Sequence, residues 1–533
     1  MGMRFFIVVV LFGLLSFLVQ AKPILILHTN DLHGFVENSV YDPSQGGYAR
    51  LKTLIEQERN KANERGISTL TLDGGDFLEG SLFYMANRVK SIFGMMDTMN
   101  YDAVAVGNHD WLMGTAELSH LLSDVDFSFV LVAANMEADR NRFPGLKKLK
   151  SHRMMEIDGH QIAILGLTTD ENNFKWVFDQ GHIADPIKIA NKWGKKLKAA
   201  GAKTVIALTH LGFSKDQELV SKTTDLDLVV GGHSHTLIDR PYFVRNKNGR
   251  QVAIVQAGEH AKYLGKLLVD IAEDGSVKVL EREVVPVTSS IDEDPIMHNL
   301  IAEARSQVNN IYGEHYLKTV VGETEINLIN SSGMMTVWNK IIADSFKESI
   351  HADIGVHSPN LTGVDIPKGM ITREQIMTTY PRFFSLDDRW GWHIYHVEMY
   401  GLVAKMLMEY YLKGGESVIL SGVKFRVEVN KKGKKKIKDI TIGGEPIRLF
   451  KKYSVAFPEG VIKGGLGMIG ILIDLIHSVN RSEITVWDAL EAKVKRLGTI
   501  REDYLQDNLA LPSGTAVSKS KTMAETTDAI FIP

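Results

Sequence analysis

Five short segments of the chain carry side chains that can bind metal ions. They read TNDLHG, DGGDFLEGS, GNHD, LTHLG and GGHSHT, and each follows an apolar run. Their candidate ligands are Asp31, His33, Asp76, Asn108, His109, His210, His233 and His235. The chain contains no cysteine, so only oxygen and nitrogen ligands are available, and these suit Mn, Zn, Fe, Co or Mg. Each segment alone has a structural explanation, as a hydrogen-bonded histidine or a glycine turn. The occurrence of all five together predicts a metal centre.

The apolar runs before these segments predict buried strands. Runs at residues 24–28, 69–75, 103–108, 129–135, 162–167, 204–210 and 226–233 end in Gly, Asn, Asp or His, and amphipathic stretches such as residues 49–65 lie between them. This alternation is typical of an α/β domain, in which the carboxyl ends of the strands gather ligands. Because positions i and i+2 of an extended segment point the same way, Asp31 is expected to converge with His33, and His233 with His235.

Length and charge narrow the class of protein. A chain of 533 residues exceeds what one hydrophobic core usually organises, so two domains are expected. The net charge is only −3, with 44% hydrophobic and 23% charged residues. Such a chain presents no broad basic surface, which argues against polymeric nucleic acid as a partner.

The first 21 residues predict a signal peptide. Arg4 precedes an apolar run from Phe5 to Val19, and Ala21 supplies a small residue at the expected cleavage site. The run is shorter than a bilayer requires, although an uncleaved anchor is the alternative. We therefore expect an exported protein, periplasmic or extracellular, without stable membrane insertion after cleavage.

The remaining chain divides into two domains and a tail. We expect a first domain over residues 22–290, a linker helix within 291–313, a second domain over 314–512 and an irregular tail over 513–533. In the second domain, residues 337–350, 399–415 and 470–479 have helical patterns, and residues 423–447 predict a hairpin followed by a turn. The basic run at 430–438 predicts a solvated hairpin tip, with an anion site as the alternative.

The five segments resemble, in order and spacing, those of the calcineurin-like metallophosphoesterases, and within them the two-domain secreted 5'-nucleotidase and 2',3'-cyclic phosphodiesterase family. The resemblance extends over residues 24 to about 270 and continues more loosely beyond. It implies a four-layer α/β/β/α sandwich, a smaller α+β C-terminal domain and a rotation of that domain about the linker helix. It also implies two divalent metal ions: Asp31, His33 and His235 would hold one, Asn108, His210 and His233 the other, and Asp76 would bridge them.

The segment GNHDWL contains the two expected catalytic residues, His109 and the metal ligand Asn108, and a departure from the family. His109 would stabilise the phosphoryl oxygens or protonate the leaving alkoxide, and Gly107 is expected to allow a tight turn. The family's usual continuation, GNHEFD, places an orienting aspartate where this chain has Leu112. Either another group orients the His109 ring, or the ring is held less firmly in the orientation that catalysis needs.

The nucleotide clamp of the family is largely missing from the second domain. The approach at residues 331–340 has no arginine, Gly363 stands in the place of another arginine, and Gly460 and Leu466 stand where a ring and a carboxylate are usual. Substitutes could come from Arg382, Phe383 and Arg389, which are our candidate substrate-binding residues, or from their neighbours Arg373, Phe384, Trp390, Trp392 and His393. Core packing is the alternative role for this aromatic cluster.

We therefore expect an exported dinuclear-metal phosphoesterase that uses a metal-bound hydroxide. A phosphomonoester, favoured as a nucleoside 5'-phosphate, is the expected substrate and small-molecule partner. The alternatives are a cyclic nucleotide, a nucleotide sugar or a sulfur compound as substrate. From another class, the chain could be a metal-containing binding protein without turnover.

Overall fold

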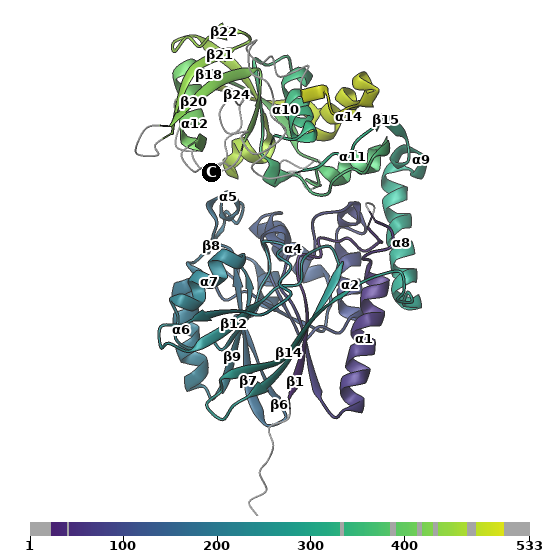
Figure 1. Ribbon diagram of the computed structural model, residues 1–533, viewed down its shortest axis with the longest axis vertical. Coiled ribbons are helices and arrows are strands. Elements are labelled where there is room, and N and C mark those ends of the chain that lie inside the picture. Colours follow the sequence, from purple (N-terminus) through teal and green to yellow (C-terminus); the bar gives the residue numbers. More distant parts are fainter. Residues whose placement is uncertain are drawn as a thin grey trace, which may run out of the picture.

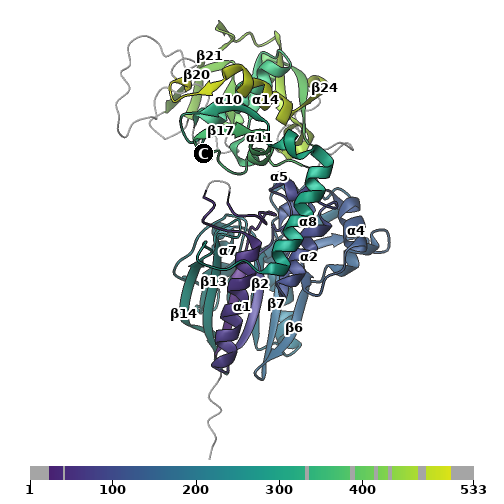
Figure 2. The same ribbon diagram turned by 90° about the vertical axis from the view of Figure 1, so that its right-hand side faces the viewer.

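The computed structural model describes residues 23–39, 42–330, 335–383, 391–412, 418–429, 435–465 and 476–505. It has two lobes, with helix α8 (Pro295–Tyr312) running along one side between them (Figures 1 and 2). The expected signal peptide (1–21) and tail (513–533) lie outside the described residues. Within the described ranges, no helix has the length and apolar character needed to cross a membrane.

The first domain is built on two six-stranded sheets. The first has the order β14-β13-β1-β2-β3-β4 and the second β11-β12-β10-β9-β7-β6. The strands of the first sheet are Ile24–Thr29 (β1), Ser68–Asp73 (β2), Ala103–Ala105 (β3), Val130–Val132 (β4), Tyr263–Ile271 (β13) and Val277–Pro286 (β14). Those of the second are His152–Ile157 (β6), His160–Thr168 (β7), Thr204–His210 (β9), Leu228–Val230 (β10), Tyr242–Arg245 (β11) and Gln251–Val255 (β12). A small ribbon pairs Met136–Ala138 (β5) with Gly181–Ile183 (β8).

Side-chain alternation along the strands explains the layers. In β1, Ile24 and Ile26 pack into the core between the sheets, whereas Leu25 and Leu27 face the helices outside the first sheet. The helices of this domain are Tyr48–Glu64 (α1), Lys90–Thr98 (α2), Asn108–Trp111 (α3), Thr115–Asp124 (α4), Asn172–Lys175 (α5), Pro186–Ala199 (α6) and Phe213–Ser221 (α7). Helices α1 and α2 cover the first sheet, and α6 and α7 the second. The predicted four-layer α/β/β/α sandwich is confirmed.

Helix α8 is fixed to both domains. Its N-cap, Asp294, accepts a hydrogen bond from the Met297 backbone N–H, and the helix ends at Gly313, whose φ is 88°. On its flank, Arg305 Nε donates to Glu37 of the first domain at 3.0 Å, and Nη1 donates to Glu374 of the second at 2.8 Å. The linker helix therefore connects the two domains through Arg305 as well as through the chain itself.

The second domain surrounds a five-stranded sheet of order β19-β16-β23-β18-β24. Its strands are Ile354–His357 (β16), His393–Tyr400 (β18), Ile419–Ser421 (β19), Lys452–Pro458 (β23) and Ile476–Thr485 (β24). Two helices, Val337–Ser349 (α10) and Val486–Leu497 (α14), pack on one face of this sheet. The other face is covered by helix Gly401–Leu412 (α12) and by a small sheet of Val423–Val429 (β20), Lys435–Ile442 (β21) and Glu445–Pro446 (β22). Val320–Thr324 (β15), Gly369–Thr372 (β17) and Thr499–Ile500 (β25) form a three-stranded sheet, beside Glu314–Leu317 (α9) and Arg373–Thr379 (α11).

One element of the second domain differs from its sequence pattern. A helix was expected over residues 470–479. Residues 470–475 lie outside the described residues, and residues 476–479 belong to strand β24, which pairs antiparallel with β18. Cross-strand pairing of Val479 with Val397 outweighs the helical spacing of this apolar run. The expected hairpin is present as β20 and β21, and most of its basic tip (430–434) lies outside the described residues.

Buried His357 of β16 should make stability depend on pH. Burial lowers the pKa of His357 to about 3, below the ordinary histidine value of 6.5. The unfolded chain therefore binds the extra proton first, so stability falls as pH drops from about 6.5 toward 3, by about 1.4 kcal/mol per pH unit. Between pH 7 and 5, the wild type should lose about 2 kcal/mol more unfolding free energy in urea than His357→Gln. Equal losses in both proteins would contradict this.

Candidate metal centre and active site

Five of the predicted metal-ligand residues adopt left-handed backbone conformations. The φ values are 53° for Asp31, 50° for His33, 57° for Asp76, 80° for His233 and 53° for His235. Non-glycine residues rarely accept such angles, and their clustering is typical of functional sites where the fold holds side chains in one geometry. All five residues follow carboxyl ends of strands in the two sheets, so the loops bring them to one edge of the sandwich.

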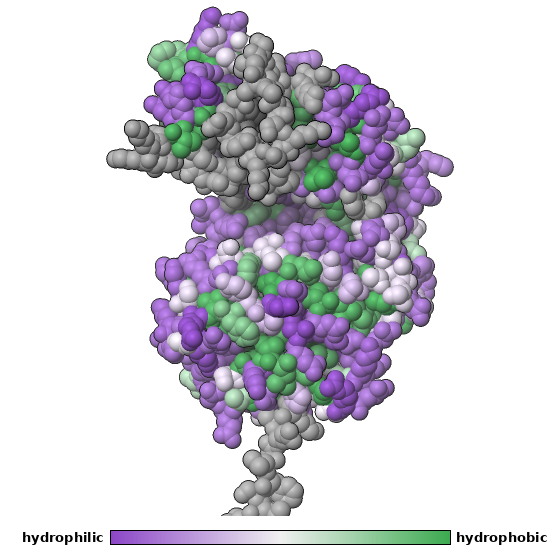
Figure 3. Space-filling model, in the orientation of Figure 1, coloured by the Kyte–Doolittle hydropathy of each residue, from purple (hydrophilic) through white to green (hydrophobic). Residues whose placement is uncertain are grey.

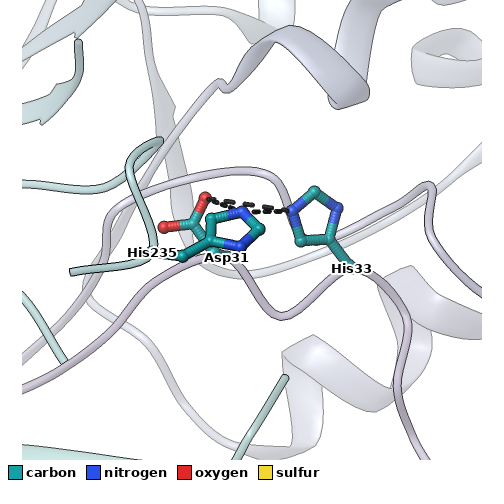
Figure 4. A group of neighbouring side chains, drawn as sticks. All are labelled: Asp31, His33 and His235. Carbon is teal, nitrogen blue, oxygen red and sulfur yellow. Dashed lines mark hydrogen bonds and ion pairs between the residues drawn. The ribbon is translucent and has the colours of Figure 1, made fainter. Parts of the chain in front are cut away.

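The first cluster joins Asp31, His33 and His235 (Figure 4). The Nε2 atoms of the two histidines lie 3.1 Å apart, and Asp31 Oδ1 lies 3.4 Å from His235 Nε2 and 3.9 Å from His33 Nε2. Asp31 and His33 converge as expected, but both have positive φ, so a left-handed loop and not an extended segment brings them together. His235 completes the group from a distant loop.

The second cluster joins Asp76, His210 and His233. Asp76 Oδ2 lies 2.9 Å from His210 Nε2 and 3.8 Å from His33 Nε2, so this carboxylate stands between the two clusters. The expectation that His233 and His235 share one centre is wrong. Both have positive φ, so their loop is not extended and their rings face different clusters.

Outer hydrogen bonds fix which nitrogen of each ring faces the centre. The Nδ1 atoms are held by Glu79 O for His33 at 2.6 Å, by Gly74 O for His210 at 2.8 Å and by the Glu259 carboxylate for His235 at 2.5 Å. An Nδ1–H that donates to these oxygens leaves the lone pair on Nε2. Two such lone pairs 3.1 Å apart, on His33 and His235, repel unless a cation or proton lies between them.

Asn108 lines a common cavity with Asp76 and His233, and it has an unpaired side-chain oxygen. Among the described residues, its buried Oδ1 has no hydrogen-bond partner. A buried amide oxygen without a partner is costly, and a metal ion would satisfy it. The carboxylates, imidazole nitrogens and amide oxygen thus fit hard or borderline divalent cations.

Gly107 and Asp110 hold the loop of Asp76 against the start of α3. The φ of Gly107 is −88°, so the expected tight turn is not the reason for glycine here. Instead, a Cβ at Gly107 would lie 2.1 Å from Asp76 Oδ1. Asp110 accepts hydrogen bonds from the backbone N–H groups of Asp76 at 2.9 Å and Gly107 at 2.8 Å. Close approach of the two loops therefore requires both residues.

His109 has an acidic neighbour that the sequence analysis missed. Its Nδ1 lies 2.8 Å from Glu79 Oε2, and Arg382 Nη1 donates to the same carboxylate oxygen at 3.1 Å. Leu112, at the position of the family's usual aspartate, is buried and lines the same cavity as His109, which is described below. Glu79 stands in the motif DGGDFLEGS, three residues after Asp76, and that proximity was the available signal.

Burial and neighbouring charges shift several pKa values. Burial alone would raise the pKa of Asp76, but the imidazoles of His210 and His109 hold it well below its ordinary value. Burial raises the pKa of Glu79 to about 8, opposed by Arg382. Burial also lowers the pKa of His109 well below its ordinary range. Such displaced pKa values in one cavity are typical of catalytic sites.

A cavity of about 1010 Å³ lies above the clusters, between the domains. In Figure 3, the surface is hollowed between the two lobes, at the level where α5 approaches the second domain in Figure 1. The first domain contributes His33, Asp76, Asn108 and Phe174 to its lining, among others. From the second domain come Asn360, Gly363, Arg382, Trp392 and Gly460.

Trp392 and Arg382 occupy the neighbourhood of two expected but missing side chains. A Cβ at Gly460 would lie 2.1 Å from the Trp392 ring, so the indole fills the space next to the glycine that replaces the family's ring. Gly363 stands where an arginine was expected, and a Cβ there would lie 2.9 Å from Pro381, the residue before Arg382. A ring and a cation thus reach the cavity from a different segment.

The other substrate-binding candidates lie elsewhere. Phe383 is fully buried, with its ring centroid 5.5 Å from that of Trp487, so it packs in the core. Arg373 pairs with Glu491 at 2.7 Å on the surface of the second domain, and His393 is buried in β18. Arg389, Phe384, Trp390 and Leu466 lie outside the described residues.

Comparison with known proteins agrees with this geometry in both domains. Residues 24–237 match the family model of calcineurin-like phosphoesterases, and residues 318–471 match that of the 5'-nucleotidase C-terminal domain. The chain belongs to the calcineurin-like metallophosphoesterases. With its C-terminal domain it falls in the 5'-nucleotidase family, and it is a 5'-nucleotidase-like hydrolase.

Relatives match over nearly the whole length of this metallophosphoesterase. The 5'-nucleotidase of Bos taurus is 26% identical over 540 residues, which cover 90% of each chain. The solved 5'-nucleotidase precursor of Thermus thermophilus has a TM-score of 0.78 at 22% identity and covers 90% of this chain and 97% of its own. The sulfate thiohydrolase SoxB of the same organism has a TM-score of 0.72 at 18% identity, covering 90% and 95%. Both solved structures share the fold of this chain.

Proposed function

We propose that this metallophosphoesterase hydrolyses a phosphomonoester, with a nucleoside 5'-phosphate as the favoured substrate. The observation that carries the proposal is the convergence of two His/Asp clusters about Asp76, beneath a cavity that Arg382 enters from the second domain. The names of the full-length relatives support the substrate class. The fold alone does not choose it, because one scaffold hosts several chemistries.

We assign the candidate ligands to two divalent metal ions. Asp31, His33 and His235 would hold one, Asn108, His210 and His233 the other, with Asp76 between them. The unpaired Asn108 Oδ1 and the facing Nε2 atoms of the first cluster support this assignment. Bound there, two ions would lower the pKa of water and neutralise charge that develops on the phosphoryl group.

The remaining residues would act on the substrate directly. Arg382 places a guanidinium beside His109, with Nη1 3.4 Å from its Nδ1, and so favours an anionic group at this end of the cavity. His109 would give a proton to the leaving alkoxide. Phe174 and Trp392 line the same cavity, and aromatic side chains there suit a nucleobase.

Hydrolysis of a substrate panel tests the proposal. The mature protein, with Mn added, would be assayed with AMP, an aryl phosphate, cyclic AMP, a nucleotide sugar and a thiosulfate ester. We expect AMP to give the highest kcat/KM. If cyclic AMP, the nucleotide sugar or the thiosulfate ester gives the highest kcat/KM instead, the proposed substrate class is wrong. If none turns over while metal binds, the protein is a binding protein.

Export is proposed as well, from the signal-like sequence of residues 1–21. Amino-terminal sequencing of the protein after expression with its leader would test it. A mature chain beginning at Lys22 supports the proposal, and retention of the leader contradicts it.

A further inference from the structure

We propose that Glu79 is the positioning residue for His109, and that Arg382 of the second domain holds Glu79 in place. This inference deepens the proposed function and rests on it for the role of His109 as proton donor. It answers how a catalytic histidine can operate with leucine at position 112.

Glu79 is the carboxyl group nearest the His109 ring among the described residues. Its Oε2 lies 2.8 Å from Nδ1. The other nearby carboxylates have different partners: Asp76 Oδ1 accepts the backbone N–H of His109 at 2.7 Å, and Asp110 accepts backbone N–H groups of the two site loops. Glu79 therefore fixes the ring orientation and leaves Nε2 for the cavity, as a carboxylate partner does for other catalytic histidines.

The contact is preorganised by burial and by the second domain. The side chain of Glu79 is 0% exposed, and that of Arg382 is 4% exposed. Removing one member of such a buried, hydrogen-bonded pair leaves the other unsatisfied and is costly, so the pair keeps the carboxyl group in one position. Glu79 also holds His33 through its main-chain oxygen, at 2.6 Å from Nδ1. One residue thus positions a ring of the metal centre and the ring of His109.

Position 112 offers a structural test of this assignment. His109 lies in the short helix α3 (Asn108–Trp111), and Leu112, its C-cap, follows three residues later on the same face. Leu112 and His109 line the same cavity. A carboxylate introduced at position 112 would therefore be within reach of the imidazole and could fix the His109 ring in place of Glu79.

The decisive experiment compares Glu79→Gln, the double variant Glu79→Gln/Leu112→Asp and the wild type in steady-state kinetics. Glu79→Gln should lower kcat about 10- to 100-fold with KM little changed. The double variant should recover most of the loss. Because Glu79→Gln also leaves Arg382 without its partner, Glu79→Gln/Arg382→Gln should show the same kcat defect, with KM raised by loss of the guanidinium. Glu491→Gln, which breaks the surface pair with Arg373, is the matched control and should keep wild-type kcat.

Nuclear magnetic resonance of ¹⁵N-histidine gives a readout that does not depend on turnover. The His109 signals, assigned by their loss in His109→Gln, should report a hydrogen-bonded Nδ1 in the wild type. That signature should change in Glu79→Gln and return in the double variant. An unchanged kcat or an unchanged His109 signal in Glu79→Gln overturns the inference, as does a defect that Leu112→Asp leaves uncorrected. If the wild type turns over no phosphoester, the proposed function fails and the spectra alone decide the role of Glu79.

Discussion

Asp76→Asn should remove metal binding from at least one of the two sites and reduce phosphoester turnover by about 10³-fold or more. Asp76 Oδ2 lies 2.9 Å from His210 Nε2 and 3.8 Å from His33 Nε2, closer to both rings than Asp31 Oδ1, which lies 3.9 Å from each. Asparagine keeps the shape and loses the charge that neutralises a second cation. A catalytic metal supplies several kcal/mol of transition-state stabilisation, and each factor of ten corresponds to about 1.4 kcal/mol. Metal content by elemental analysis and kcat/KM would be measured together.

A matched substitution separates the metal effect from loss of structure. Asp216 is a fully buried carboxyl that contacts Thr209, the residue before His210, and its pKa is raised by burial to about 7. Asp216→Asn should retain both metals and wild-type turnover. If Asp76→Asn binds two equivalents of metal and turns over like the wild type, the central role of Asp76 is wrong.

The fold was predictable because its strands have a strong local pattern. Strands β1, β2 and β9 are apolar runs that end at polar residues, and their carboxyl ends meet at one edge. Which strand joins which sheet depends on tertiary pairing, and that arrangement came from the family resemblance. Residues 476–479 show the limit, because pairing of β24 with β18 decides their conformation.

The candidate site was predictable from residue types, but its outer contacts were not. Asp31, His33 and Asp76 stand in short motifs whose residue types and order predict a metal centre. Glu79 and Arg382 are 303 residues apart, and their contact depends on how the two domains meet. A missing aspartate at position 112 can be read from the sequence, whereas its replacement from another loop requires the structure.

The same reasoning applies to the substrate side of the cavity. Glycine at position 460 indicates a lost ring, yet the Trp392 indole lies against that glycine. The sequence carries both residues, but their proximity arises from the packing of β18 beside β23. Compensation of this kind is invisible to an analysis of one motif at a time.

His109→Gln should lower kcat by about 10²- to 10⁴-fold, the range for loss of a general acid. Gln retains a hydrogen-bonding side chain of similar length but cannot transfer a proton. The KM should change little, because Arg382 and the metal ligands remain. His120→Gln, at an exposed histidine of α4, is the matched control and should have wild-type kinetics.

Leaving-group dependence distinguishes the two roles considered for His109. A general acid matters most when the leaving alkoxide is a strong base, as in AMP, and least for an aryl phosphate whose leaving group needs no proton. A residue that only stabilises the phosphoryl oxygens affects both substrates alike. The short contact to Glu79 favours the acid, because a carboxylate at Nδ1 stabilises the imidazolium, the form of His109 that carries a proton on Nε2. We therefore expect His109→Gln to reduce turnover of AMP at least tenfold more than that of the aryl phosphate, and equal losses would assign His109 to phosphoryl stabilisation instead.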